Sequence, residues 1–191
     1  MVRTVLGCAL ATGLLAAAAN ATTIDFNGFS SGTSYTQSGA TITDTGGTGL
    51  VGSTDPNGTT GLLSATGPYA PLRADISGGT DFVSIDLGDF DSDPDLLFLD
   101  AYDSSNTLIG STSLLIDASF SGMKTLSLSI AGIDYVIFGS TTPSLGGSSV
   151  YSDNFTFDST TPPVPEPLTL ALFGAGLAGA AAVRRRRKAA K

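Results

Sequence analysis

Apolar and polar residues alternate along two stretches of this chain. Residues 83–87 and 126–130 place Val, Ile or Leu at every second position, with Ser or Asp between them. Side chains of a β-strand point to the two faces of a sheet in turn, so this period predicts strands with one buried face. Shorter apolar groups predict further strands at residues 24–26, 40–43, 135–138 and 151–157.

A continuous apolar run at residues 96–99 leads into Ala101 and Tyr102, and it predicts a central strand buried on both faces. The turn-forming residues 103–106 follow, and apolar residues return by residue 109, which predicts a β-hairpin. Residues 27–71 are rich in Thr, Ser and Gly, which favours long loops or short edge strands. No helix is convincing between the two chain ends. Strands recurring about every 8 to 12 residues predict an all-β antiparallel sandwich.

The first residues of the chain have the organisation of a secretory signal peptide. A positive residue precedes an apolar stretch at residues 4–18, and small residues follow it. The Ala-x-Ala pattern at Ala19 and Ala21 predicts cleavage before Thr22. Cleavage there would remove the only cysteine, Cys8, with the signal helix.

The last residues of the chain combine a proline motif, an apolar segment and a basic cluster. The motif is Val164, Pro165, Glu166 and Pro167, and the cluster is Arg184, Arg185, Arg186, Arg187 and Lys188. Between them, residues 168–183 carry no charge. As a helix they would span roughly 24 Å, against a hydrocarbon core of about 30 Å, which predicts a short single membrane helix. Basic residues beside a membrane segment stay in the cytoplasm, so the preceding chain is expected outside.

This C-terminal pattern resembles the PEP-CTERM sorting signal of exopolysaccharide-producing Gram-negative bacteria. The resemblance implies recognition by an exosortase, a membrane peptidase that would cut near the Pro-Glu-Pro, and release to the cell surface or extracellular matrix. An uncleaved C-terminal anchor is the alternative. The predicted organisation is a signal peptide at 1–21, a β-sandwich domain at 22–158, a linker at 159–163 and a sorting tail at 164–191 with its membrane segment at 168–183.

Removing both signals leaves about 140 residues, enough for one domain with its own core. This part contains sixteen aspartates against Arg73 and Lys124, a net charge of about −14, which argues against nucleic acid or an anionic membrane as its partner. It has no cysteine, histidine or tryptophan. Cysteine nucleophiles, Ser-His-Asp triads and the usual zinc sites are therefore excluded there, as are disulfide bonds.

The region from residue 23 to residue 157 resembles the jelly-roll, galactose-binding-like and carbohydrate-binding modules found in many PEP-CTERM proteins. Such modules often hold a structural calcium ion between their first and last strands. The resemblance implies Asp25 and Asp153 as its ligands, and the alternative is that both residues cap turns. Five tyrosines are candidates for stacking against sugar rings. They are Tyr35, Tyr69, Tyr102, Tyr135 and Tyr151.

Four aspartates alternate in a second acidic candidate, at positions 89, 91, 93 and 95. Carboxylates at this spacing can converge on one calcium ion, which takes six to eight oxygens at about 2.3 to 2.6 Å. The EF-hand pattern fails, because Pro94 stands where the turn glycine belongs. The simpler interpretation is a solvated acidic connection between two strands.

Three functional hypotheses remain open. The first is a monomeric, non-enzymatic sandwich that associates weakly with exopolysaccharide. The second is a glycan hydrolase with Asp86 and Asp100 as its carboxylate pair, which would have to lie about 5 to 9 Å apart. The third is a structural secreted domain without a ligand.

Overall fold

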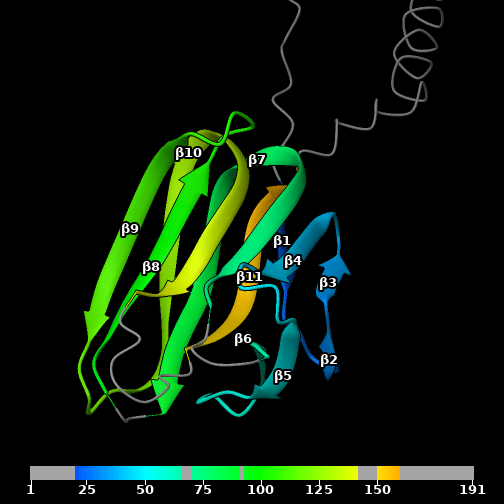
Figure 1. Ribbon diagram of the computed structural model, residues 1–191. Helices are drawn as coiled ribbons and strands as arrows, with labels where there is room; N and C mark the ends of the chain where they lie inside the picture. Colours follow the sequence, from blue (N-terminus) through cyan, green and yellow to red (C-terminus); the bar gives the residue numbers. More distant parts are fainter. Residues whose placement is uncertain (1–19, 66–69, 91–92, 142–149, 160–191) are drawn as a thin grey trace, which may run out of the picture. The chain divides into compact units, whose positions relative to one another are not determined.

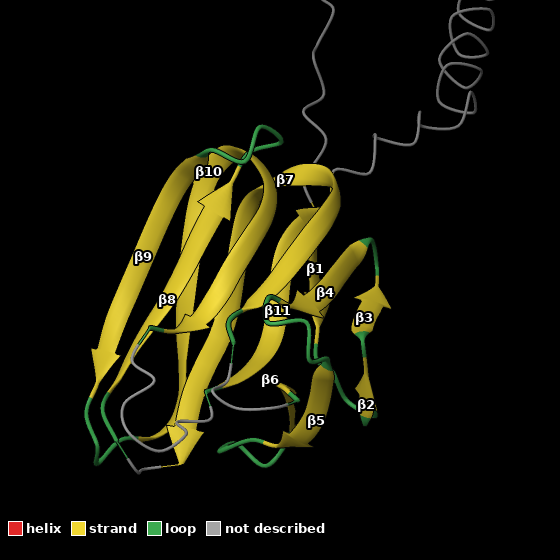
Figure 2. Cartoon of the chain, in the orientation of Figure 1, coloured by secondary structure: helices red, strands yellow, loops and turns green. Residues whose placement is uncertain are grey.

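The computed structural model describes residues 20–65, 70–90, 93–141 and 150–159. All eleven elements within these ranges are strands (Figure 2). They are β1 (Asn20–Ile24), β2 (Ser31–Gly32), β3 (Ser34–Gln37), β4 (Ala40–Asp44), β5 (Leu50–Thr54), β6 (Thr60–Ser64), β7 (Leu72–Phe90), β8 (Asp95–Tyr102), β9 (Leu108–Ile116), β10 (Ser121–Ser140) and β11 (Tyr151–Ser159). A helix long and apolar enough to cross a membrane is not found in these ranges, and the predicted segment 168–183 lies outside them.

Two long strands, β7 and β10, pair antiparallel from Phe90↔Ser121 at one end to Leu72↔Phe138 at the other. One half of this ladder continues through β4 to β3 on one side and through β8 to β9 on the other. The other half continues through β11 to β1 and β6. The same two strands therefore contribute to both layers of the domain (Figure 1).

The ladder bends where its register breaks. The register shifts twice between Asp75 and Phe82 of β7, which pair with Tyr135 and Ser129 of β10, and Thr80↔Ile133 is the one pair between the two shifts. Gly78 and Gly79 at this bend have φ values of 85° and 72°, which glycine adopts without the steric cost that a Cβ atom brings. Strands that change sheet through bulges form the corners of orthogonally packed sheets. The bend thus turns one ladder into two facing layers.

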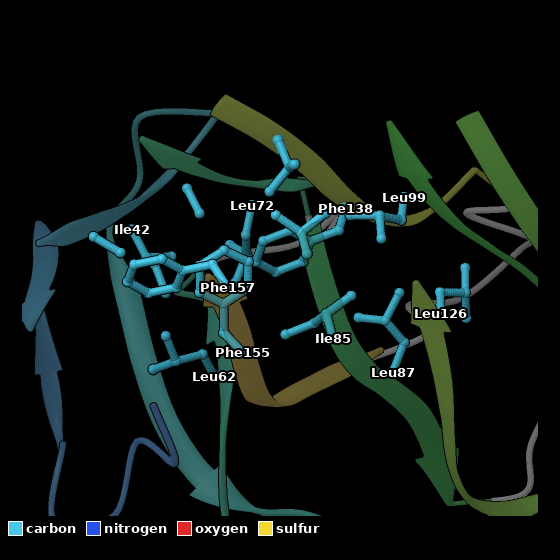
Figure 3. Packing of buried hydrophobic residues seen from close by; sticks show 14 of the residues in the cluster. Ile42, Leu62, Leu72, Ile85, Leu87, Leu99, Leu126, Phe138, Phe155 and Phe157 are labelled. Carbon is cyan, nitrogen blue, oxygen red and sulfur yellow. The ribbon is translucent and has the colours of Figure 1, made fainter. Parts of the chain in front are cut away.

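Apolar side chains from both layers fill the space between them (Figure 3). Phe138 of β10 stacks on Phe155 of β11 with ring centroids 5.9 Å apart, and both rings are fully buried. Phe157 continues this aromatic row, 5.6 Å from Phe155. Leu99 of β8 and Ile85 of β7 belong to the same cluster. Burial of these side chains, worth about 1.5 to 3 kcal/mol each, drives the layers together.

The predicted all-β antiparallel sandwich is confirmed by this arrangement. The alternating stretches lie in β7 and β10, and the predicted hairpin is β8 with β9. The short strands expected before residue 71 are β2 to β6. The first arm of β7, residues 72–77, was not predicted. The predicted linker residue Ser159 ends β11, and Asn20 and Ala21, placed before the predicted cleavage point, belong to β1.

We predict that Gly88→Ala strongly destabilises the fold. Gly88 lies in β7 between Met123 of β10 and Tyr151 of β11, and an added Cβ would be 1.9 Å from the carbonyl oxygen of Gly122. Two backbones would have to separate, which we expect to cost about 3 kcal/mol or more. Gly58→Ala is the control, because its φ is 85° but no atom lies within 4 Å, so about 1 to 2 kcal/mol of backbone strain is expected. Urea unfolding measures both, and equal losses would contradict the prediction.

Candidate functional site

Polar and aromatic side chains gather on the outer side of one layer, opposite the core. Along β7, Ala74 and Ile76 face inward, so Arg73 and Asp75 face outward. The register carries this side across the neighbouring strands to Thr41, Thr43, Tyr135, Ile137, Asp100 and Tyr102. We call these eight residues the outer face. It forms because inward-facing and outward-facing residues alternate along four adjacent strands, and the register places the outward-facing residues of each strand next to those of its neighbour.

Tyr135 occupies the centre of the outer face and is held from three directions. The guanidinium carbon of Arg73 lies 3.6 Å from the centroid of its ring, and Tyr102 stacks on the ring at 4.8 Å with an interplanar angle of 4°. Its hydroxyl donates to Asn106 Oδ1 at 3.2 Å. Cation–π and stacking contacts are attractive at these distances. Tyr135 is therefore 5% exposed and serves as a support, while Tyr102 and Arg73 remain partly accessible.

Hydrogen bonds and burial determine the protonation state of the polar side chains on the outer face. Arg73 Nε donates to both oxygens of Asp75, at 3.0 and 3.1 Å, and this hydrogen bond raises the pKa of Arg73. Burial, followed by the nearby charge of Asp100, raises the pKa of Tyr102, so its hydroxyl keeps its proton. Asp100 accepts a hydrogen bond from the Ser111 hydroxyl at 2.5 Å. The face thus presents donors and acceptors beside an aromatic ring, the combination that fits sugar hydroxyls and their apolar ring faces.

The other predicted tyrosines have different surroundings. Tyr35 packs edge-to-face on Phe26 and Phe29, so its partly buried ring lies against the core. Tyr151 makes the same kind of contact with Phe90, which is 47% exposed. Tyr69 lies outside the described residues. Sequence reasoning missed Arg73 and Asp75, although the L-R-A-D-I pattern from residue 72 to residue 76 alternates and could have indicated them.

The acidic run of residues 89–95 brings three carboxylates together. Oxygens of Asp89, Asp93 and Asp95 all lie within 4.8 Å of one another, and Asp91 lies outside the described residues. Asp89 is 4% exposed and Asp95 0%, so the simpler interpretation, a solvated connection, is wrong for these two. Asp95 accepts a hydrogen bond from the Ser140 hydroxyl at 2.8 Å. Carboxylate oxygens this close repel one another, and a hard divalent cation would neutralise them.

Asp25 and Asp153 lie near adjoining strands, because β1 pairs with β11 through Ile24↔Phe155. Their side chains nevertheless have separate partners. Asp25 is exposed and accepts hydrogen bonds from the Asn27 backbone at 3.3 Å and from Asn27 Nδ2 at 3.1 Å, as a turn cap does. Asp153 is 2% exposed. A calcium ion shared by these two residues stays a prediction.

Asp153 shares one hydroxyl with a second buried carboxylate. Thr59 Oγ1 lies 2.9 Å from Asp153 Oδ2 and 3.0 Å from Asp55 Oδ2, and Asp55 is 1% exposed. A hydroxyl has one proton, so it can donate to only one of them. Burial raises the pKa of Asp153 to about 6, and the charges of Asp55 and Asp86 act in the same direction. A proton on Asp153 that is donated to Thr59 satisfies both contacts.

We predict that Asp153 makes the domain less stable as the pH rises. Its folded-state pKa of about 6 lies above the ordinary 3.8, so its stabilising contribution is complete below pH 3.8 and is lost as the pH passes 6. Asp153→Asn keeps the uncharged shape. Between pH 4 and pH 7 the wild type should therefore lose up to about 3 kcal/mol relative to this variant. Chemical denaturation at several pH values measures the difference, and parallel profiles would contradict the prediction.

The two calcium hypotheses predict different effects of metal removal. We expect a chelator to lower the melting temperature of the wild type, because calcium at 100 times its Kd stabilises a fold by about 2.7 kcal/mol. Asp93→Asn should abolish this chelator effect, since it removes the half-exposed member of the cluster. Asp25→Asn should leave the effect intact. If Asp25→Asn abolished the chelator effect and Asp93→Asn did not, the site between the first and last strands would be supported. A wild-type melting temperature that the chelator leaves unchanged would contradict both calcium hypotheses.

The aspartates considered for hydrolysis have unrelated partners. Asp86 accepts hydrogen bonds from Thr125 at 2.5 Å and from Asn154 at 2.9 Å. Asp100, a residue of the outer face, accepts its hydrogen bond from Ser111. Asp86 lies in the half of β7 that pairs with β11, whereas Asp100 pairs with Ile137 in the other half of the ladder. This arrangement gives no support to an acid and base acting on one bond.

The sorting residues lie outside the described part of the chain, as do the basic cluster and Ala19. Residues 163–187 match the family model of the PEP-CTERM protein-sorting motif. A search of curated proteins gave no match.

Among solved structures, the K1 cleaved adhesin domain of Lys-gingipain from Porphyromonas gingivalis W83 is similar, with 12% identity and a TM-score of 0.48. The similarity covers 73% of this chain and 98% of that domain. A mutant family 29 carbohydrate-binding module is also similar, with 14% identity and a TM-score of 0.42. This similarity covers 72% of this chain and 91% of the module. An arabinose-bound α-L-arabinofuranosidase has 12% identity and a TM-score of 0.43. This similarity covers 70% of this chain and 25% of the arabinofuranosidase chain. Likeness at this level does not indicate what the chain binds.

Proposed function

The chain carries a PEP-CTERM protein-sorting motif at residues 163–187, which indicates an exported protein with a membrane-anchored precursor, and we propose that it is a non-enzymatic, glycan-associated protein of the cell surface or matrix. The motif implies recognition by an exosortase. Cleavage near Pro165–Pro167 would then release the domain from its short membrane segment and basic cluster. The acidic charge of the domain suits this location, because it favours solubility outside the cell.

The outer face is the observation that supports glycan recognition. Arg73 and Asp75 hold each other beside a fixed aromatic stack, so their polar atoms are positioned before a ligand arrives. Preorganised polar groups lose little conformational entropy on binding. The accessible ring of Tyr102 can cover the apolar face of a sugar, while Asp75 and Asp100 accept hydrogen bonds from its hydroxyls. Because the domain carries a net charge of about −14, a neutral glycan fits better than an acidic one.

Binding at this face should be weak. Both sides of the Tyr135 ring are already in contact with Arg73 and Tyr102, so Tyr102 alone offers an aromatic surface within the stack. One shallow stacking contact and a few hydrogen bonds correspond to a Kd near millimolar, about −4 kcal/mol. Retention in a polysaccharide matrix would then depend on many copies acting together.

We predict that substitutions on the outer face weaken glycan binding without unfolding the domain. Tyr102→Ala removes the accessible ring, and Arg73→Ala removes both the ion pair and the support of Tyr135. Each should weaken binding of the exported protein to host exopolysaccharide by about tenfold, or 1.4 kcal/mol. Tyr35→Phe is the matched control, because Tyr35 packs toward the core, and it should bind like the wild type. Calorimetry and pull-down measure binding, and circular dichroism checks the fold.

The same assay separates the alternatives. Release of reducing ends from the polysaccharide, lost in Asp86→Asn or Asp100→Asn, would replace this proposal with a hydrolase. An absence of binding even at high polysaccharide concentration would favour a structural domain without a ligand. Equal binding by wild type, Tyr102→Ala and Arg73→Ala would place the glycan elsewhere on the domain.

A further inference from the structure

The edge strand β9 offers unpaired backbone along its free side. It ends the strand order of its layer, pairing with β8 on one side and with no strand of the described residues on the other (Figure 1). In an antiparallel strand, every second residue directs its N–H and C=O groups away from a given neighbour. Such an edge is a template for another strand, and natural proteins protect it with charges, proline or bulges.

The sequence of β9 carries little of this protection. Its nine residues, L-I-G-S-T-S-L-L-I, include no charge and no proline, although the domain as a whole is strongly acidic. Leu108 is 52% exposed, Leu114 41% and Leu115 66%, and these are three of the four large apolar residues most exposed among the described ones. A register shift beside Tyr102 is the single irregularity in its ladder with β8. The strand therefore combines a free edge with exposed apolar side chains.

The second layer is also apolar on this side. Residues 121–129 of β10 pair with β7 and with no other strand of the described residues. Leu128 and Ile130 of this arm are only partly buried, and both approach Gly110 of β9. The open side of the sandwich thus has apolar contributions from both layers, which a partner lying along β9 would cover.

The sequence of β9 indicates what that partner is. In an antiparallel pair of identical strands centred on Thr112, Ser111 lies opposite Ser113, Ile109 opposite Leu115 and Leu108 opposite Ile116. Each pair occurs twice. Serine faces serine and a large apolar side chain faces another, and such cross-strand pairs are favourable. Gly110 lies opposite Leu114, so the larger side chain covers the smaller residue. Moving the centre by one residue would place Ser111 opposite Leu115 and lose this match.

We propose that β9 pairs antiparallel with β9 of a second copy of this chain, around a twofold axis at Thr112. The pairing joins two strongly acidic domains through their uncharged strand. Continuing the register places Asp117 opposite Thr107, a hydroxyl donor, so the nearest flanking carboxylate does not meet another one. A twofold contact uses the same edge of both copies and therefore stops at two. It revises the monomer that the sequence predicts.

Cysteine substitutions in the full-length chain test the register, with Cys8→Ser added so that the introduced cysteine is the only thiol. Residues directly opposite in an antiparallel pair have Cβ atoms about 4.5 to 5.5 Å apart, close to the separation that a disulfide needs. Thr112→Cys should form a disulfide-linked dimer under mild oxidation, seen as doubled mass on a non-reducing gel. Ser111→Cys mixed with Ser113→Cys should cross-link more than either alone. Thr36→Cys, on the exposed edge strand β3, is the control and should not cross-link.

A charge variant tests the apolar contribution independently. Leu115→Lys should raise the dimer dissociation constant by about tenfold or more, because two ammonium groups would be desolvated against Ile109. Phe90→Lys places the same charge at another exposed apolar residue, 47% exposed against 66% for Leu115, and should leave the dimer unchanged. Sedimentation of the exported protein measures the constant. The proposal is overturned by a wild type that stays monomeric, by cross-linking of Thr36→Cys as strong as that of Thr112→Cys, by growth beyond two copies, or by Thr112→Cys linking to a different protein.

Discussion

The continuous ladder between β7 and β10 is the interaction on which the other parts of the structure depend. Each strand has one arm in each layer, so the ladder joins the layers covalently and by hydrogen bonds at the bend. One arm positions Arg73, Asp75 and Tyr135 on the outer face, while the other arm carries Asp89 of the acidic cluster next to its last residue, Phe90. A change that separates the two strands would therefore disturb the core, the outer face and the acidic cluster together.

Much of the fold could be predicted because each layer buries one face. Because of this constraint, apolar and polar residues alternate in residues 83–87 and 126–130, where the apolar side chains are large and the alternation is clear. The first arm of β7 was missed because Ala74 gives a weak apolar signal and because a Gly-Gly pair, here Gly78 and Gly79, is typical of a turn. Local sequence does not distinguish a turn that ends a strand from a bulge that bends it. The pairing that places Arg73 on Tyr135 depends on this bend, so the outer face was also missed.

The aspartates show why candidate chemistry is harder to predict than strands. Asp25 caps an exposed turn, Asp153 is buried beside Asp55 and has a raised pKa, and Asp89 joins two neighbours within 4.8 Å. In sequence they are similar, since each stands beside glycine, serine, asparagine or an aromatic residue. Their environments differ because residues distant in the chain supply the burial and the partners, as Thr59 does for Asp153. Charge pattern alone identified the acidic character of the domain but not the state of each carboxylate.

Pairing through β9 and weak glycan contact reinforce each other geometrically. A twofold axis that relates adjacent antiparallel strands of one sheet is perpendicular to that sheet, so equivalent faces of the two copies point the same way. The outer face extends over β4, β7, β10 and β8, and β9 is the next strand. Two outer faces would therefore form one larger surface, on which a single polysaccharide chain can contact both copies. The second contact is then intramolecular, and two sites of millimolar affinity can retain a polymer that neither would hold alone.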